Sequence, residues 1–465
     1  MRDNGPLKIG LAPIKRGTTR METALLQKQL ILQRMADITP ENVALVGIED
    51  VLPEGLLYCH DQVAAVEKAF KRAGVHALFL PHCDFGCEEV VGQLAKRMGV
   101  PVLIWGNRDP YPDYPGGKDR DTQCGTLAST KALQRYGVPF SYILNTDVED
   151  APLKRGFEDF CAVANVVRRF RGMRILLAGT RPQAFLSVIY NEDELLRRFG
   201  IEVYPWGSAA WLEAADRILA ERADEVTREM QAFARQVDVS DLTYERQRRQ
   251  AALVLALCEM AERHDIDGVA MECWSLLPER YGISGCQIVG QLCQRGLPCA
   301  CEGDVLGAVT AVMMQAAALD KEPVFFSDIT SRHPEQDNTE LLWHCGPYPP
   351  SLAHPDTPPK STFHGRGAFQ LKNGPITIAR LDAANGGYSL FSGEGRGVDG
   401  PPKKGNYVWL EVDCWADWEE KIVFGPYIHH VAGAYGQYSQ ILSEACKYLG
   451  GVSPDPMRPV KRVLG

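Results

Sequence analysis

The sequence lacks the features of a membrane, secreted or nucleic-acid-binding protein. It contains no run approaching the roughly 18 apolar residues of a membrane span, and the opening MRDNGPLKIGLAP has no apolar signal-peptide core. A formal net charge of -9 leaves no broad basic face for a phosphate backbone, and the arginines at 246, 248 and 249 are an isolated cluster. We expect a cytoplasmic protein that binds neither membranes nor nucleic acids.

The chain also lacks internal repeats, periodic glycine or proline, and a compact cysteine framework. Its 14 cysteines are scattered through strand-like and helix-like segments, which favours free thiols over disulfides. With 465 residues, 45% of them hydrophobic, the chain is too long for one ordinary core. We therefore expect a globular protein of two to four domains.

Short apolar runs alternate with helical segments over much of the chain. LKIGLA, VALVGI, VHALFL, VPVLIW and VPFSYIL predict a parallel sheet with crossover helices in an N-terminal α/β domain, residues 1–170. A second set follows, in the order MRILLAG, IEVYPW, DGVAMEC, LPCACE, PVFFSD and LLWHCG. It predicts a second doubly wound, Rossmann-like domain over 171–355.

The pattern of apolar and polar residues changes after the proline-rich segment 347–360. GAFQLKNGPITIARLD, GGYSLFSG and NYVWLEVD are short alternating strands with glycine turns. They predict a C-terminal β-rich, barrel-like domain over 356–465, and helical periodicity over 431–449 predicts a terminal helix.

Polar residues abruptly end four of the apolar runs in the central region: Glu272, Glu302, Asp328 and His344. Ligands collect beyond the carboxyl ends of parallel strands, so these positions are candidate site residues. Between Glu302 and Asp328, VLGAVTAVMMQAAAL predicts a helix with hardly a polar side, buried between neighbours. We interpret strand, helix and strand as one βαβ unit that brings the two acids to one ligand.

Two adjacent carboxylates repel unless a cation or a shared proton neutralises them, so the pair indicates a divalent metal site. His344 and the pair His429–His430 could complete it. Ordinary structural roles stay open for each residue: helix-dipole stabilisation for Glu302, capping of a turn for Asp328, a helix N-cap for Asp304, a core position for His344, and a loop position for His429–His430.

The motifs CEGDVLGAVT, PVFFSD, LLWHCG and HHVAGAYG, in this order, resemble the L-fucose isomerase and L-arabinose isomerase superfamily. The resemblance implies metal ligation by Glu302, Asp328 and His430. The arabinose branch has a further histidine ligand, for which His344 is the matching position, whereas the fucose branch does without it.

The resemblance also implies an aldose–ketose isomerase working through a cis-enediol on Mn²⁺, or on Mg²⁺ or Co²⁺. Glu302 and Asp328 would be both ligands and the catalytic acid/base pair. Family members form homo-oligomers with shared active sites, here a trimer or hexamer. By that arrangement Arg16, Asp84 and Cys124 are candidate substrate-binding residues.

The sugar itself stays open between two alternatives. One is a neutral monosaccharide of the L-fucose or arabinose type. The other is the sulfonated hexose sulfoquinovose, for which Lys15, Arg16 and Arg20 could form a cationic pocket. Two other classes of protein stay as alternatives, a non-catalytic sugar-binding protein and a metal-dependent aldolase.

Overall fold

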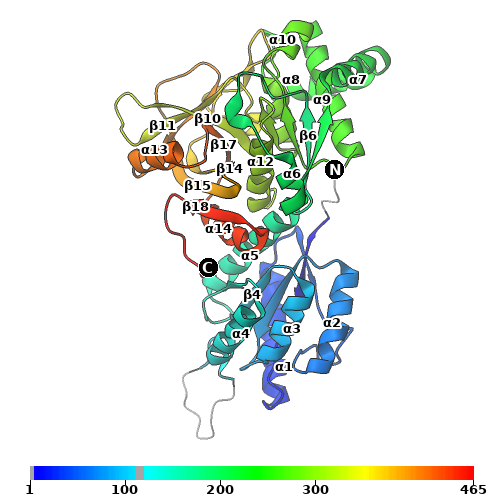
Figure 1. Ribbon diagram of the computed structural model, residues 1–465, viewed down its shortest axis with the longest axis vertical. Coiled ribbons are helices and arrows are strands. Elements are labelled where there is room, and N and C mark those ends of the chain that lie inside the picture. Colours follow the sequence, from blue (N-terminus) through cyan, green and yellow to red (C-terminus); the bar gives the residue numbers. More distant parts are fainter. Residues whose placement is uncertain (1–4, 111–119) are drawn as a thin grey trace. The chain divides into compact units, whose positions relative to one another are not determined.

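The chain divides into two compact units in the computed structural model, which describes residues 5–110 and 120–465 (Figure 1). The N-terminal unit comprises residues 5–168 and 461–465, and the C-terminal unit comprises Arg169–Val460. The C-terminal unit contains both an α/β sheet and a β-barrel.

The N-terminal unit is built on one parallel sheet of five strands in the order β2-β1-β3-β4-β5. Helices α2, α3 and α4 pack side by side over one face of it (Figure 1). Its elements are β1 (Leu7–Leu11), α1 (Met21–Ile38), β2 (Val43–Val46), α2 (His60–Ala73), β3 (Ala77–His82), α3 (Glu88–Met98), β4 (Val102–Gly106), α4 (Thr122–Tyr136), β5 (Ser141–Tyr142) and α5 (Ala151–Phe170), whose last two residues belong to the C-terminal unit.

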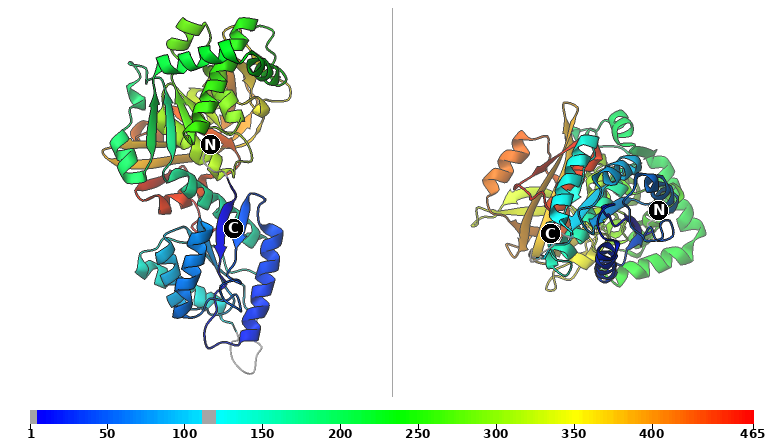
Figure 2. Two further views of the ribbon diagram at one scale, coloured as in Figure 1. Left: turned by 90° about the vertical axis from the view of Figure 1, so that its right-hand side faces the viewer. Right: turned by 90° about the horizontal axis from the view of Figure 1, so that it is seen from below.

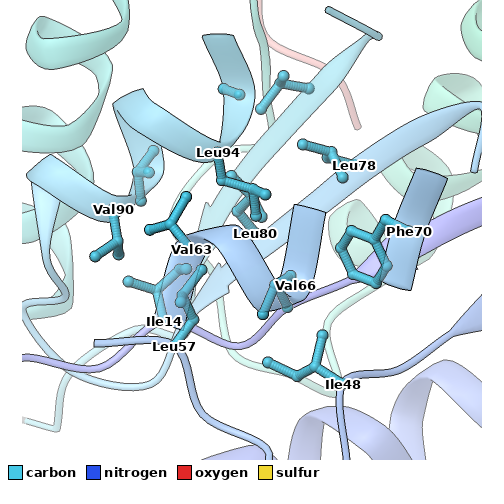
Figure 3. Packing of buried hydrophobic residues seen from close by; sticks show 14 of the residues in the cluster. Ile14, Ile48, Leu57, Val63, Val66, Phe70, Leu78, Leu80, Val90 and Leu94 are labelled. Carbon is cyan, nitrogen blue, oxygen red and sulfur yellow. The ribbon is translucent and has the colours of Figure 1, made fainter. Parts of the chain in front are cut away.

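The core of the N-terminal unit lies between this sheet and its helices. Val63, Val66 and Phe70 recur at helical spacing on α2 and are completely buried, facing Leu78 and Leu80 of β3 (Figure 3). Burying one such side chain stabilises the fold by about 1.5–3 kcal/mol. This packing holds α2 against the sheet, and the polar loops extend from the ends of the sheet's strands.

The C-terminal unit begins with a four-stranded parallel sheet in the order β7-β6-β8-β9. Figure 2 shows helices α7 to α9, in green, gathered beside it. Its elements are β6 (Arg174–Ala178), α6 (Glu192–Glu194), a π-helical turn (Leu195–Phe199), β7 (Glu202–Trp206), α7 (Ser208–Glu221), α8 (Ala223–Ala234), α9 (Tyr244–Arg263), β8 (Gly268–Met271), α10 (Leu276–Tyr281), α11 (Cys286–Gln294), β9 (Cys299–Cys301) and α12 (Val305–Ala317).

Six antiparallel strands then close into a barrel in the order β16-β11-β10-β17-β14-β15, because β15 pairs with β16. The shorter strands β12, β13 and β18 extend the sheet at its margins. The elements are β10 (Phe325–Arg332), β11 (Thr339–His344), β12 (Lys360–Ser361), β13 (Gly367–Gln370), β14 (Gly374–Ala384), β15 (Gly387–Val398), β16 (Asn406–Glu411), α13 (Trp415–Phe424), β17 (His430–Tyr435), α14 (Ser439–Leu449) and β18 (Val452–Pro456). Two Rossmann-like sheets followed by a β-barrel confirm the predicted fold class.

Two sequence-based assignments are wrong. PVFFSD and LLWHCG do not extend the parallel sheet, because they form β10 and β11 of the barrel and pair antiparallel. The expected βαβ unit therefore does not exist. The helix expected from position 431 begins only at Ser439, and the residues before it form β17.

Helix α12 is the layer between the parallel sheet and the barrel. It contacts β8 and β9 on one side and β14 and β17 on the other, and all 13 of its residues are buried. This confirms the expectation of a helix buried on every side. Because α12 starts three residues after Glu302, it also sets the position of that residue against the barrel.

The cysteines agree with a further expectation. All 14 cysteines lie in the described ranges, and each is a free thiol. Within residues 5–110 and 120–465, the helices are too short or too polar to cross a membrane.

Candidate active site

Glu302 lies in a strained turn between β9 and α12. Its φ of 62° is in the left-handed region, which costs a residue with a side chain roughly 1–2 kcal/mol. Gly303 follows with a φ of 67°, and a Cβ there would lie 3.1 Å from the backbone of Arg181, so a side chain has little room. The next residue, Asp304, caps α12 by accepting a hydrogen bond from the Gly307 N–H at 2.8 Å. The strained turn thus places the Glu302 carboxylate beyond the sheet edge, and the N-cap reading of Asp304 is confirmed.

Asp328 and His430 lie side by side on neighbouring strands of the barrel wall. They are register partners on the antiparallel strands β10 and β17. Directly opposed residues of such a pair project on the same face. Oδ1 of Asp328 lies 3.4 Å from Nε2 of His430, and the same Nε2 lies 3.3 Å from Oε2 of Glu302. Glu302 and Asp328 therefore meet at His430, although they come from different sheets.

His344 ends β11 and is 1% exposed. Its Nε2 lies 3.8 Å from Oδ1 of Asp328. Its Nδ1 accepts a hydrogen bond from the backbone N–H of Cys345 at 2.8 Å. Burial lowers the pKa of His344, but the charge of Asp328, the contact with Cys345 and the charge of Glu302 together outweigh burial and raise that pKa overall.

These side chains form two overlapping groups that could hold a metal ion. One contains Glu302, His344 and His430, and the other contains Asp328, His429 and His430. The ligand atoms of each group lie within 4.8 Å of one another. Three polar atoms at this point, Oδ1 of Asp328, Nε2 of His344 and Nε2 of His430, are buried without a hydrogen-bond partner among the described residues. Unpartnered buried oxygen and nitrogen atoms that converge on one point fit a divalent cation with its bound oxygens.

A fully buried ionic network stands behind His430. Its Nδ1 lies 2.9 Å from Oδ2 of Asp304, and Asp304 also receives hydrogen bonds from both terminal nitrogens of Arg380. Arg380 in turn donates from Nε to Asp382 at 2.9 Å. The sequence analysis overlooked Arg380; a charged residue inside the apolar run of β14 was the available signal.

The network determines the protonation of its members. Burial raises the pKa of Asp304, but the charge of Arg380 and the hydrogen bond from His430 outweigh it and hold that pKa well below its usual range. Burial lowers the pKa of His430, yet the neighbouring carboxylates of Asp304 and Glu302 raise it to about 9. Burial also opposes ionisation of Glu302, but the neighbouring side chains of His430 and Trp274 lower its pKa overall. The carboxylates Glu302 and Asp304 are thus ionised near neutral pH.

An aromatic wall borders the site. It consists of Trp274, Phe185 and His429, stacked with ring centroids 5.5 Å apart for the first pair and 5.7 Å for the second. Phe185 also meets the ring of His430 edge-on at 5.2 Å. Trp274 is 50% exposed. Neither Trp274 nor Phe185 was among the predicted site residues; Trp274 follows the end of β8, where the strand-end pattern could have found it, whereas Phe185 lies in an irregular segment after β6.

The other predicted substrate contacts lie in the N-terminal unit, at the ends of β1 and β3. Arg16 is exposed, with its guanidinium 4.3 Å from the ring centroid of Phe85. Asp84 is fully buried and accepts hydrogen bonds from the N–H groups of Arg16 and Gly86 and from the hydroxyl of Thr19, so its carboxylate holds this turn. β1 and β3 are neighbours where the order of the sheet reverses, which is where open α/β sheets bind ligands.

Cys124 and Lys15 occupy different surroundings in the same unit. Cys124 is exposed on the first turn of α4, and the next residue, Gly125, packs directly on the backbone of Phe85. Lys15 is 2% exposed, and its amine donates to the carbonyls of Arg16 and Thr19. The Lys15 charge is therefore directed at the backbone of its own loop.

Glu272, the remaining polar strand end, does not join the candidate site. Its two carboxylate oxygens lie within hydrogen-bonding distance of the Ser275 and Ser208 hydroxyls, at 3.0 and 3.3 Å. A Cβ at Gly179 would collide with its side chain. These contacts make Glu272 a packing residue between β6, β8 and α7.

Comparisons with known proteins point to one kind of enzyme. Residues 10–171 match the family model described as fucose/sulfoquinovose isomerase, N-terminal domain. A sulfoquinovose isomerase of Priestia aryabhattai is 23% identical over 446 residues, covering 94% of this chain and 96% of the relative. Another, of Clostridium sp. (strain MSTE9), is 27% identical over 289 residues, covering 60% of this chain and 61% of the relative.

Solved structures add no functional information. A solute-binding protein of an ABC transporter from Bacillus halodurans C-125, with bound myo-inositol, covers 68% of this chain and 91% of its own at 13% identity. Its TM-score of 0.17 is too low to indicate a shared fold.

Proposed function

We propose that this chain, a member of the fucose isomerase-like family of aldose–ketose isomerases, converts the sulfonated hexose sulfoquinovose into its ketose. The curated relatives reported above are sulfoquinovose isomerases, and the Priestia enzyme aligns over 94% of this chain. They favour the sulfonated sugar over the neutral sugars of the L-fucose and arabinose type.

Glu302, Asp328 and His430 would hold the divalent cation on which the reaction depends. The observation that supports this most is the convergence of both carboxylates on Nε2 of His430, at 3.3 and 3.4 Å. A donor set led by carboxylates suits a hard or borderline ion, so we propose Mn²⁺, with Mg²⁺ or Co²⁺ as alternatives. When bound, such an ion supplies Lewis-acid stabilisation of charge that develops on the sugar oxygens.

The two carboxylates would also move the proton. Aldose–ketose interconversion takes a proton from one of two adjacent carbons, C1 and C2, and returns it to the other. Glu302 approaches from the β9–α12 turn and Asp328 from the barrel wall, so the pair can act on opposite sides of the carbon chain. The ionised state of Glu302 near neutral pH suits it to start as a base in one direction.

The sulfonate requires a cationic partner. Arg16 is our proposed contact, because it is exposed at the point where the order of the N-terminal sheet reverses. Asp84 would hold the Arg16 turn, and Cys124 stays a predicted neighbour of the substrate. A trimer or hexamer with shared active sites stays a prediction from the family resemblance, and a cytoplasmic location stays a prediction from the sequence.

Substrate assays of the purified, Mn²⁺-loaded protein test this proposal. Sulfoquinovose, L-fucose and L-arabinose are offered separately, and the formation of each ketose is followed by NMR. We expect turnover of sulfoquinovose with a kcat/KM at least about tenfold above that of either neutral sugar, since loss of a charge-assisted hydrogen bond costs about 1.5–3 kcal/mol. Turnover of neutral sugars alone would overturn the choice of substrate but not the reaction class. Failure to isomerise all three sugars would overturn the proposed substrate.

A further inference from the structure

Nδ1 accepts a hydrogen bond in His344 but donates one in His430. Nδ1 of His430 faces the carboxylate of Asp304 at 2.9 Å, whereas Nδ1 of His344 faces the backbone N–H of Cys345 at 2.8 Å. An ionised carboxylate can only accept a hydrogen bond, and a backbone N–H can only donate one. The two contacts therefore select different tautomers.

The contact of His430 with Asp304 selects Nε2 as the nitrogen that can bind a cation. Its Nδ1 carries the proton donated to Asp304, so Nε2 is the nitrogen that gives up its proton when a cation binds. That atom lies 3.3 Å from Glu302 and 3.4 Å from Asp328. A histidine whose Nδ1 donates to a carboxylate is the usual arrangement for a metal ligand.

The tautomer of His344 is the reverse. Its Nδ1 lone pair accepts from the Cys345 N–H, so the ring proton is on Nε2. Nε2 is the atom directed at the site, 3.8 Å from Oδ1 of Asp328, and among the described residues it has no hydrogen-bond partner. His344 thus offers the site an N–H and has no lone pair free for a cation.

We infer that His344 is a hydrogen-bond donor to an oxygen of the bound sugar, and that it is not a metal ligand. The inference rests on the proposed function for the identity of the acceptor, a carbonyl or hydroxyl oxygen next to the cation. The distance of 3.8 Å to Asp328 exceeds a hydrogen bond, so that carboxylate does not satisfy the donor. A fixed N–H aimed at an oxygen that gains negative charge stabilises that charge without reorganising.

The donor assignment is tested first without any sugar. Two-bond ¹H–¹⁵N correlation spectra distinguish protonated from unprotonated ring nitrogens in the ten histidines, and single His→Gln variants assign the signals. We expect Nε2 of His344 to be protonated both before and after saturation with Mg²⁺, whereas Nε2 of His430 is unprotonated once Mg²⁺ is bound. An unprotonated Nε2 on His344 in the Mg²⁺-bound protein would overturn the inference.

Metal affinity gives the second test, by calorimetric titration with Mn²⁺ alone. We expect His344→Gln and His344→Leu to bind Mn²⁺ within about threefold of the unaltered protein, while the matched variant His430→Gln loses at least about tenfold, since even residues that only orient ligands typically cost 10–100-fold. A loss of Mn²⁺ affinity in both His344 variants equal to that in His430→Gln would overturn the inference.

Steady-state kinetics separate a donor from a residue that only fills space. His344→Gln keeps an N–H, so we expect it to retain at least about tenfold more kcat than His344→Leu, in line with the 10²–10³-fold cost of removing such a donor. Equal kcat in the two variants would overturn the donor role. If the enzyme isomerises none of the sugars, the NMR and titration results still decide the tautomer and the metal question, so the two failures are distinguishable.

Discussion

Nδ1 of His430 lies 2.9 Å from Oδ2 of Asp304, and neither side chain has any exposed surface. The contact joins the N-cap of α12 to the first residue of β17, so it connects the helix that follows Glu302 with the barrel strand beside Asp328. It orients the ring of His430 so that Nε2 points at both proposed acidic ligands.

We predict that Asp304→Asn weakens Mn²⁺ binding by about 10–100-fold, because His430 loses the carboxylate that fixes its tautomer. Asparagine is as good an N-cap as aspartate, so α12 keeps its start. Isothermal titration with Mn²⁺ measures the effect. Asp382→Asn is the matched control, since it also removes a carboxylate from Arg380, but Asp382 makes no hydrogen bond to a proposed metal ligand. Equal losses in the two variants would assign the effect to Arg380 rather than to His430.

The backbone strain at Glu302 predicts a conflict between stability and activity. At a φ of 62° glycine is relaxed, whereas alanine keeps the strain. We therefore expect Glu302→Gly to have a free energy of unfolding about 1 kcal/mol higher than Glu302→Ala, with both variants inactive. Denaturant unfolding of the metal-free proteins measures the difference. An alanine variant as stable as the glycine variant would show that the turn is unstrained.

Glu340 predicts a pH dependence of stability. Burial raises the pKa of this carboxyl to about 7, with a smaller contribution from Glu419 against the opposing charge of Arg332. The folded chain therefore holds a proton on Glu340 that the unfolded chain releases near pH 4.5. Its stabilising contribution is full below that pH and is lost as the pH rises through about 7.

We expect Glu340→Gln to remove this loss and to be more stable than the unaltered protein at pH 8 by about 1–3 kcal/mol. Urea unfolding at several pH values between 4.5 and 8 measures it. Parallel curves for the two proteins across that range would contradict the prediction.

The sulfonate proposal predicts a selective effect of Arg16. Arg16→Ala should raise KM for sulfoquinovose by about 10–100-fold, the cost of one charge-assisted hydrogen bond, and change kcat/KM for neutral sugars far less. Arg72→Ala removes another exposed arginine of the same unit and should leave both unchanged. An equal effect of Arg16→Ala on kcat/KM for charged and neutral sugars would contradict a contact between Arg16 and the sulfonate.

The fold class follows from the sequence because apolar periodicity reports which segments are strands and which face is buried. α12 is the clearest case, since a helix without a polar side must be covered all round. Periodicity does not report the partner of a strand. PVFFSD reads equally well as a parallel strand or as one wall of a barrel, and only long-range packing decides between them.

The candidate site was predictable where its chemistry is local. Glu302, Asp328 and His344 are polar residues at the ends of apolar runs, and this pattern can be read along the chain, whereas His430 was identified from the family resemblance. Arg380 and Phe185 come from segments whose proximity depends on the closed barrel and the loop after β6, so no spacing rule identifies them; Trp274 follows the end of β8 and is the one the strand-end pattern could have found. The sequence analysis paired Glu302 with Asp328 as residues of one sheet, whereas the structure brings them together from two different sheets.

The most direct test of the central claim is sulfoquinovose isomerisation by four matched samples: the Mn²⁺-loaded protein, the metal-stripped protein, and the Mn²⁺-loaded variants Glu302→Gln and Asp328→Asn. We predict conversion by the first sample and no detectable conversion by the second. The variants should be folded but slower by at least about 10²–10⁴-fold, the contribution typical of an acid/base residue. Full activity in either variant, or in the metal-stripped protein, would contradict a metal-dependent isomerase site at Glu302 and Asp328.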